Sequence, residues 1–332
     1  MRPTVVAITG GSAGVGRAVA RRFARSGARI GLIARGRERL EAAKAEVEDL
    51  GGEALVLPLD VADAAAVDEA AATIENRFGP LDGWINNAMA TVFAPVREIS
   101  PEEYRRATEI TYLGTVWGTM AALSRMLPRN RGTIVQVGSA LAYRSIPLQA
   151  PYCAAKHAIR GFTESLRTEL LHEGSRVHVT MVQLPAHNTP QFSWGRAKLP
   201  RQPQPVPPIF QPEVAAQAIH YAATHRRREL MAGWPTVKAI YGDKVAPGLL
   251  DRLLGRDGYD DQQTDEPLDG ERPGNLFDPV RGDFAAHGRF DDRSRSRSLL
   301  LDLDLHRRTI AVAAGVAALG AAALVKNVNR RE

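Results

Sequence analysis

A glycine-rich turn near the N-terminus constrains the fold of this chain more than any other feature. Residues 9–16 read T-G-G-S-A-G-V-G, between an apolar run at 4–9 and an amphipathic stretch at 15–26. Glycine lets the backbone turn sharply and lets other groups approach it closely. A strand, a glycine turn and a helix in direct succession are typical of the first unit of a parallel α/β sheet.

The residues that follow, through about position 183, repeat this alternation of strand and helix. The expected strands are 4–9, 29–34, 54–59, 81–86, 132–138 and 177–183. The expected helices between them are 15–26, 37–50, 63–78, 101–127 and 152–173. The strands are nearly continuous apolar runs, as expected when helices cover both faces of a sheet. We therefore predict an α/β fold, a doubly wound parallel sheet of the Rossmann type, in a domain over residues 1–240.

The composition changes after this alternating region. Residues 198–212 contain six prolines, which predicts a semi-extended loop. A helix is expected from 213 to about 228, and the sequence M-A-G-W-P-T-V after it is a candidate final strand. From about 255 to 298 the chain is rich in Gly, Asp, Arg and Ser, so we predict that the extension at 241–305 is partly irregular or disordered.

The last segment, 306–332, is predicted to form a hydrophobic helix. Residues 309–325 carry no charge and have basic residues on both sides. Seventeen residues are at the short limit for crossing a bilayer, and the predominance of Ala and Gly makes insertion only marginally favourable. Two interpretations stay open, membrane association and a small-residue helix that packs on protein.

The net charge of +6 comes from Lys and Arg spread along the chain, which is typical of a solvated basic surface. The R-S-R-S-R-S run at 293–298 is too short to favour RNA binding, so no nucleic-acid partner is predicted, and no metal site. Cys153 is the only cysteine, which excludes an intramolecular disulfide and suits a reducing compartment. We predict a small buried residue there rather than a reactive thiol. The N-terminus leads directly into a strand instead of a signal peptide, so a cytoplasmic location is expected, with membrane association through the last segment as the open alternative.

The glycine turn also predicts a ligand. Gly10 suits the tight turn, Gly14 lets the backbone approach a pyrophosphate, and Gly16 allows the helix to pack closely on the strand. Free N–H groups at the start of the helix then face phosphate. The turn therefore indicates a dinucleotide site that also includes Ser12 and Val15.

The end of the second strand bears on which dinucleotide is bound. NAD sites usually carry an acidic residue there to hold the ribose 2′-hydroxyl. This chain has Arg35 at that place and no acid until Glu38. A guanidinium suits a 2′-phosphate, so NADP(H) is favoured over NAD(H); the alternative is a surface arginine at a helix start.

Three further residues carry a recognisable chemistry. Tyr152 and Lys156 are four apart at the start of a helix and project from one face. Ser139 ends a strand at the carboxyl edge of the sheet, where ligands bind in open α/β folds. A phenol titrates near 10, and an ammonium beside it favours the phenolate, while a serine hydroxyl can orient a carbonyl group. The combination predicts proton transfer during reduction of a ketone.

With these motifs in order, the chain resembles the short-chain dehydrogenase/reductase family over roughly residues 1–240. The resemblance rests on T-G-G-S-A-G-V-G, Asp60-Val61, N-N-A at 86–88, Ser139 and Y-C-A-A-K at 152–156. It implies that Ser139 positions the substrate oxygen and that Tyr152 is the acid/base. Lys156 would bind the nicotinamide ribose and lower the pKa of Tyr152.

The resemblance also implies the rest of the cofactor site. Asp60 and Val61 would bracket the adenine, and Asn87 and Ala88 would line the cofactor near the central strand. Thr189 would touch the carboxamide or pyrophosphate, with His187 beside it. The Pro-rich segment, about 187–212, stands in the place of the family's substrate lid. A homo-oligomer built from helices flanking the catalytic tyrosine is implied as well.

Three positions depart from the family pattern. Thr111 stands where the family has an Asn that holds a water in the proton relay, and we include its hydroxyl in the predicted catalytic set. Met89 replaces a glycine after N-N-A, and Leu184-Pro185 replaces Pro-Gly. These departures predict a divergent subgroup.

The function predicted from these residues is NADP(H)-dependent interconversion of an alcohol and a ketone or aldehyde. The expected substrate is small and apolar, because the segments placed to line the pocket contain Leu141, Tyr143, Ile146, Phe192 and Trp194. The alternative is a cofactor-binding scaffold or sensor with little turnover, which Thr111 and Met89 favour.

Overall fold

The computed structural model describes residues 4–272 and 274–307. A seven-stranded sheet forms its centre, with strand order β11-β7-β6-β4-β1-β2-β3 and parallel pairing between all neighbours. The strands are β1 Val5–Thr9, β2 Arg29–Ala34, β3 Glu53–Pro58, β4 Gly83–Asn86, β6 Thr133–Val137, β7 His178–Gln183 and β11 Glu229–Met231. The order reverses between β1 and β4, which opens a crevice for ligands at the carboxyl ends of these strands.

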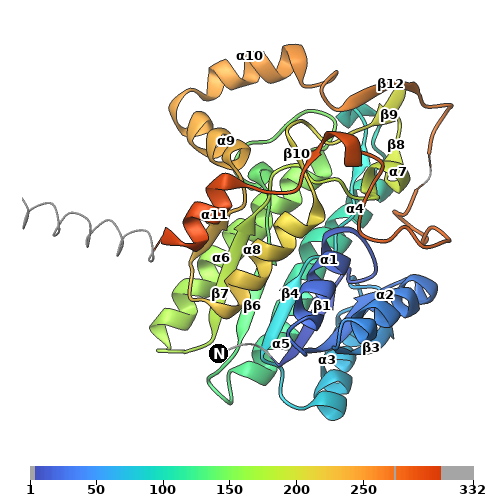
Figure 1. The fold of residues 1–332 in the computed structure, drawn as a ribbon. Helices are drawn as coiled ribbons and strands as arrows, with labels where there is room; N and C mark the ends of the chain where they lie inside the picture. Colours follow the sequence, from blue (N-terminus) through green and yellow to red (C-terminus); the bar gives the residue numbers. More distant parts are fainter. Residues whose placement is uncertain (1–3, 273, 308–332) are drawn as a thin grey trace, which may run out of the picture.

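Helices cover both faces of the sheet (Figure 1). One face packs against α1 Gly14–Ala24, α2 Arg37–Asp49 and α8 Pro212–Thr224. The other packs against α3 Ala64–Phe78, α4 Pro101–Thr108, α5 Gly114–Met126 and α6 Ala150–His172. Alternate residues of β1 supply the two cores, Val6 and Ile8 to the first and Val5 and Ala7 to the second, so the strand is apolar throughout.

The six strands predicted from the sequence are confirmed within two residues at each end. The helix predicted at 101–127 is instead α4, a π-helical turn at Glu109–Leu113, and α5. The predicted final strand M-A-G-W-P-T-V was misplaced: β11 ends at Met231, and α9, Trp234–Val245, begins three residues later. Pro235 suits a helical first turn, so the predicted domain boundary at 240 falls inside this helix.

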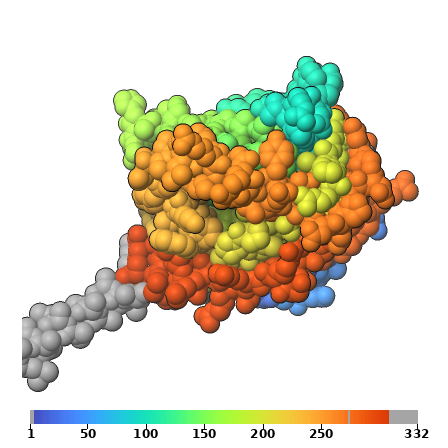
Figure 2. Space-filling model, turned by 90° about the horizontal axis from the view of Figure 1, so that it is seen from above, coloured from blue at the N-terminus to red at the C-terminus, as the bar shows by residue number. Residues whose placement is uncertain are grey.

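The Pro-rich segment and the extension pair with each other. Within the former, β9 Arg201–Pro203 pairs with β12 Gln263–Pro267, and β10 Ile209–Phe210 pairs with β13 Ser294–Arg295. The extension also contains α10 Pro247–Asp257 and α11 Leu299–Leu305. Figure 2 shows it as an orange-to-red surface around the yellow Pro-rich segment.

The expectation of partial disorder is therefore corrected for the described part of 241–305. Much of this extension is irregular, but it is packed on the domain, with Leu276, Ala286 and Phe290 buried. These apolar residues are too widely spaced to form a periodic pattern, so the sequence did not reveal them. Residues 309–325 lie outside the described residues. Between 4 and 307, with 273 omitted, no helix is long and apolar enough to cross a membrane.

Candidate active site

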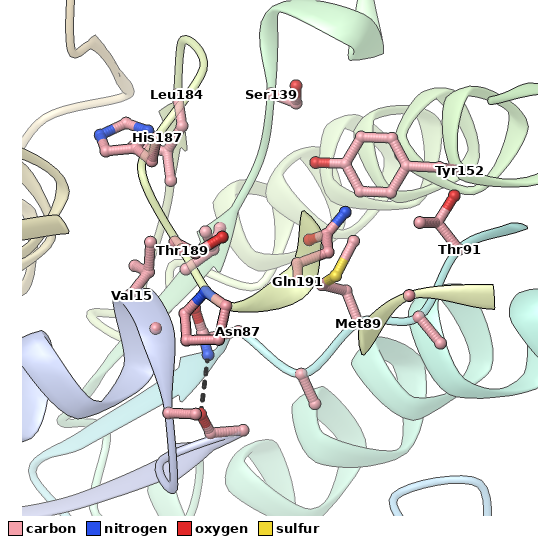
Figure 3. Close-up of a pocket in the computed structure, with 18 of the residues that line it drawn as sticks. Val15, Asn87, Met89, Thr91, Ser139, Tyr152, Leu184, His187, Thr189 and Gln191 are labelled. Atoms are coloured by element: carbon pink, nitrogen blue, oxygen red, sulfur yellow. Dashed lines mark hydrogen bonds between the residues drawn. The ribbon is translucent and has the colours of Figure 1, made fainter. Parts of the chain in front are cut away.

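A cavity of about 420 Å³ lies at the carboxyl ends of the central strands. It runs from the glycine turn past the ends of β2, β3, β4 and β6 to the start of α6. It brings together most of the predicted site residues: Gly10, Ser12, Gly14, Val15, Arg35, Asp60, Val61, Asn87, Ala88, Ser139, Tyr152, Lys156, His187 and Thr189. Figure 3 labels six of them, Val15, Asn87, Ser139, Tyr152, His187 and Thr189.

The glycine turn is held by contacts that only glycine allows. Gly10 and Gly14 have φ of +66° and +55°, in the left-handed region. A Cβ on Gly16 would lie 2.1 Å from the Gly10 carbonyl oxygen. The Asn87 amide donates to the Thr9 carbonyl at 3.0 Å, and the Thr9 hydroxyl accepts from the backbone N–H of Asn87 at 2.9 Å. The turn and the end of β4 therefore form one rigid wall of the cavity.

Ser139, Tyr152 and Lys156 meet at the other end of this cavity. Ser139 follows β6, and the other two lie in the first turns of α6. The Ser139 hydroxyl accepts from the Leu141 N–H at 3.1 Å and lies near the Tyr152 hydroxyl. The Lys156 ammonium is buried, donates to the Val137 carbonyl at 2.6 Å and lies 5.4 Å from the centroid of the Tyr152 ring.

Burial shifts the pKa values of both titratable groups of this set. It raises the pKa of the Tyr152 phenol to about 12, although the neighbouring Ser139 hydroxyl opposes the shift. Burial lowers the pKa of Lys156 to about 8. The Lys156 ammonium donates to the Val137 carbonyl, and a lowering of the Tyr152 pKa by this charge stays a prediction. The Tyr152 phenol is therefore protonated at neutral pH.

Comparison with known proteins agrees with this geometry. The family model for short chain dehydrogenases matches residues 4–197. The uncharacterized oxidoreductase YxnA of Bacillus subtilis is 31% identical over 328 residues, which cover 98% of this chain and 91% of that protein. The chain belongs to the short-chain dehydrogenase family.

Solved structures show the same fold. An alcohol dehydrogenase from the archaeon Thermococcus sibiricus, complexed with 5-hydroxy-NADP, aligns with a TM-score of 0.59 and 26% identity. The alignment covers 69% of this chain and 95% of that one. A metagenomic short-chain oxidoreductase in complex with NADP aligns with a TM-score of 0.58 and 25% identity, over 69% and 96% of the two chains.

Two predicted residues do not reach the cavity of this short-chain dehydrogenase. Gly16 packs against the backbone of the turn, as predicted, and does not line the cavity. Thr111 is fully buried in the π-helical turn. Its hydroxyl donates to the Ala90 carbonyl at 2.8 Å and accepts from the Ala90 N–H at 3.0 Å. This hydroxyl therefore anchors the loop after β4 instead of facing Tyr152 and Lys156.

His187 lies in the cavity wall as a neutral imidazole. Its Nδ1 is 2.9 Å from the Pro185 carbonyl, and burial lowers its pKa to about 4 despite that contact. Thr189 packs against the glycine turn, since a Cβ on Gly14 would lie 3.4 Å from its side chain. Both residues belong to the loop that follows β7 and line the cavity.

The predicted apolar pocket is largely present, with one correction. Leu141, Ile146, Phe192 and Trp194 line the cavity, the last two from α7, Gln191–Trp194. Tyr143 does not, because its hydroxyl donates to Glu229 at 2.7 Å and its ring packs under Arg160. Cys153 is buried, as predicted.

Sequence reasoning missed several residues of this site. Met89, Gln149, Gln191 and Arg39 also line the cavity. Met89 did stand out as a departure from the family pattern, but no local signal distinguished Gln149, Gln191 or Arg39 from ordinary surface residues.

The largest feature of the site that the sequence did not reveal is residues 274–290 of the extension, which we call the strap. The Ala285 carbonyl accepts from the Gly14 N–H at 3.1 Å, and Asn275 lines the cavity. Asp283 forms an ion pair with the buried Arg17 of α1. This strap covers the end of the cavity beside the glycine turn and β2.

An acidic residue of α2, Glu46, forms ion pairs with Arg17 and Arg21 of α1. Burial opposes ionisation of Glu46, but hydrogen bonds from Arg21 and Arg17 lower its pKa to about 2, from an ordinary value of 4.5. A carboxylate with a lowered folded-state pKa stabilises the fold above its unfolded pKa, and this stability is lost as the pH falls through the folded value. We expect Glu46→Gln to lower the free energy of unfolding at pH 7 by about 2 kcal/mol.

Denaturant titrations between pH 7 and pH 2.5 check this prediction. The difference between the wild type and Glu46→Gln should be constant above about pH 4.5 and shrink as the pH approaches about 2. Glu48→Gln is the matched control, because Glu48 is half-exposed on the same helix and, among the described residues, forms an ion pair only with Lys44, at 3.7 Å. Equal effects of the two variants would contradict the role of Glu46.

Proposed function

We propose that this protein is an NADP(H)-dependent oxidoreductase that interconverts an alcohol and a ketone or aldehyde. One observation carries the proposal: Ser139, Tyr152 and Lys156 share a single cavity with the glycine turn. The family supports a dehydrogenase or reductase, and the NADP-complexed structural neighbours support a nicotinamide cofactor.

The residues present fit such a cofactor. The left-handed glycines at 10 and 14 place no side chain at these two points of the turn, and α1 begins here with its N-terminal N–H groups, of which that of Gly14 donates to the Ala285 carbonyl. The opposite end of the cavity is basic, with Arg35 and Arg39 near the end of β2. Asp60, which follows β3, is paired with Arg106. These features support a bound dinucleotide with a 2′-phosphate.

The nicotinamide, when bound, supplies or accepts the hydride. Tyr152 would then donate its phenolic proton to the oxygen of the carbonyl being reduced, and Ser139 would hold that oxygen through its hydroxyl. Lys156 would supply positive charge close to the phenolate that remains, which favours the transfer. Its low pKa, about 8, also allows it to pass on a proton near neutral pH.

The proposed substrate is an apolar carbonyl compound or alcohol. Leu141, Ile146 and Phe192 surround the space beside Tyr152, and Met89 adds another flexible apolar side chain. A relative from Acinetobacter baylyi named fatty acyl-CoA reductase is 30% identical over 228 residues, covering 68% of this chain and 75% of that protein. That name is compatible with a long apolar substrate.

A steady-state screen tests the proposal. Purified protein is assayed with NADPH and NADH in parallel against short, aromatic and long-chain aldehydes and ketones. We expect the highest kcat/KM with NADPH and an apolar carbonyl compound, at least tenfold above NADH, since a 2′-phosphate adds charge-assisted hydrogen bonds. A clear preference for NADH would overturn the cofactor assignment, and tight NADPH binding without turnover on any substrate would favour a scaffold or sensor.

A further inference from the structure

We propose that Gln149 determines substrate specificity, because its side-chain oxygen is placed to accept a hydrogen bond from a hydroxyl or N–H group that the substrate carries close to the reacting carbonyl. Gln262 of the extension holds the Gln149 amide in the orientation that this contact needs. The inference rests on the proposed function and narrows it, from an apolar carbonyl compound to one with a hydrogen-bond donor on a neighbouring carbon.

Gln149 lies beside Tyr152 in the wall of the cavity. It is the N-cap residue of α6, and Tyr152 is the third residue of that helix. The N-cap side chain and the residue three positions later are direct neighbours at a helix start. Both residues line the same cavity, and only 7% of the surface of Gln149 is exposed. A substrate whose carbonyl oxygen meets Tyr152 therefore has its neighbouring carbons within reach of the Gln149 amide.

The orientation of this amide follows from Gln262, which is buried. The Gln262 Nε2 donates to the Pro147 carbonyl at 2.9 Å and to the Gly258 carbonyl at 2.7 Å. Both N–H groups of Gln262 are thus used, so its Oε1 is the atom that faces Gln149. This oxygen requires a donor, which the Gln149 Nε2 supplies at 2.7 Å. The nitrogen of the Gln149 amide is therefore fixed, and its oxygen is left to face elsewhere.

The Gln149 Oε1 accepts no hydrogen bond from the part of the chain that the structure describes. An acceptor in a largely buried side chain is unfavourable without a donor. Leu141, Ile146 and Phe192, which line the same cavity, have no polar side-chain atom to offer. A ligand that brings a hydroxyl or N–H group into the cavity satisfies this oxygen, and a purely apolar ligand leaves it unsatisfied.

The backbone just before Gln149 is held in an unusual conformation. Leu148 has a φ of +65°, in the left-handed region that leucine rarely adopts. Its carbonyl accepts from the Ala94 N–H at 3.0 Å, and its side chain is buried in one cluster with Phe93. Such conformations persist where the surrounding structure holds them, and they are concentrated at ligand sites. The acceptor is thus positioned before a substrate arrives, which lowers the cost of binding.

The residue that positions Gln149 lies outside the segment matched by the family model. That match ends at residue 197, whereas Gln262 belongs to the extension, directly before β12. Gly258 packs closely on Pro147, since an added Cβ would lie 3.1 Å from the proline ring. The extension therefore shapes the end of the cavity that holds Tyr152, in addition to the end that the strap covers.

The experiment measures kcat/KM of the full chain for ketones that differ only at the carbon beside the carbonyl. α-Hydroxyacetophenone, α-methoxyacetophenone and propiophenone form one such set, and the corresponding alkyl ketones form a second. We expect kcat/KM for the hydroxy ketone to exceed that for the methoxy ketone by at least about tenfold, because only the hydroxyl can donate to Gln149. The methoxy ketone controls for the electron-withdrawing effect of the oxygen, and it should resemble propiophenone.

Two variants assign this selectivity to the amide pair. Gln149→Met keeps the length of the side chain without its oxygen, so the ratio of hydroxy to methoxy kcat/KM should fall to within about twofold of unity. Gln262→Met frees the Gln149 amide to rotate and should give an intermediate ratio. The ratio compares two substrates on one protein, so a loss of folded protein alone does not change it.

Gln191→Met is the matched control. The Gln191 amide also lines the cavity (Figure 3), but it makes no hydrogen bond with any described residue, so nothing fixes its orientation. This variant should keep the wild-type ratio within about threefold. Equal kcat/KM for hydroxy and methoxy ketones in the wild type would overturn the inference, as would a ratio lost in Gln191→Met and kept in Gln149→Met. Absence of turnover on every ketone would instead overturn the proposed function.

Discussion

Tyr152→Phe is expected to reduce turnover on the order of 10²- to 10⁴-fold while leaving the affinity for NADPH within about threefold of the wild type. The phenol is the protonated group beside Ser139, and burial holds its pKa near 12. Phenylalanine keeps the ring and its packing but removes the only proton that Tyr152 can donate. The loss should therefore appear in kcat, with little change in cofactor binding.

The measurement combines steady-state kinetics on the best carbonyl substrate of the screen with NADPH titration. Tyr143→Phe is the matched control, because this tyrosine follows the same strand end but donates to Glu229, away from the cavity. It should keep turnover within about threefold and lose at most about 1 kcal/mol of stability. Undiminished turnover in Tyr152→Phe would sink the proposed mechanism.

Gly16→Ala is expected to abolish measurable cofactor binding, or to prevent folding of the first βα unit. The added methyl carbon would lie 2.1 Å from the Gly10 carbonyl oxygen and 2.6 Å from the Asn87 amide nitrogen. The first of these is backbone, so the clash can be relieved only if the turn moves away from α1. Overpacking of a rigid site costs typically about 1–3 kcal/mol, and here the shift falls on the residues proposed to hold the pyrophosphate.

Thermal unfolding and NADPH titration of Gly16→Ala separate the two outcomes. Gly161→Ala is the control, since that glycine lies in α6 with nothing within 4 Å of an added Cβ. Alanine there should leave binding unchanged and add up to about 1 kcal/mol of stability through helix propensity. A folded Gly16→Ala protein with the affinity of the wild type would contradict the steric argument.

The predictions that succeeded depend on residues close together in the chain or on strands that share an edge. Six strands could be located because buried parallel strands are apolar throughout. Tyr152 and Lys156 could be paired because one helical turn separates them, and Ser139 joins them because it ends a strand at the same edge. Thr111 shows the limit of this reasoning: its position matched the family's Asn, but its hydroxyl is used by Ala90.

Sequence alone thus determined the fold class, the glycine turn and the Ser139–Tyr152–Lys156 set of this protein, because periodicity and short spacings report local geometry. Tertiary structure alone decided how the basic end of the cavity is used. The contact between Arg35 and Asn275 joins residues 240 positions apart, and no periodic pattern announces it. The strap that Arg35 holds comes from a segment whose composition suggested disorder.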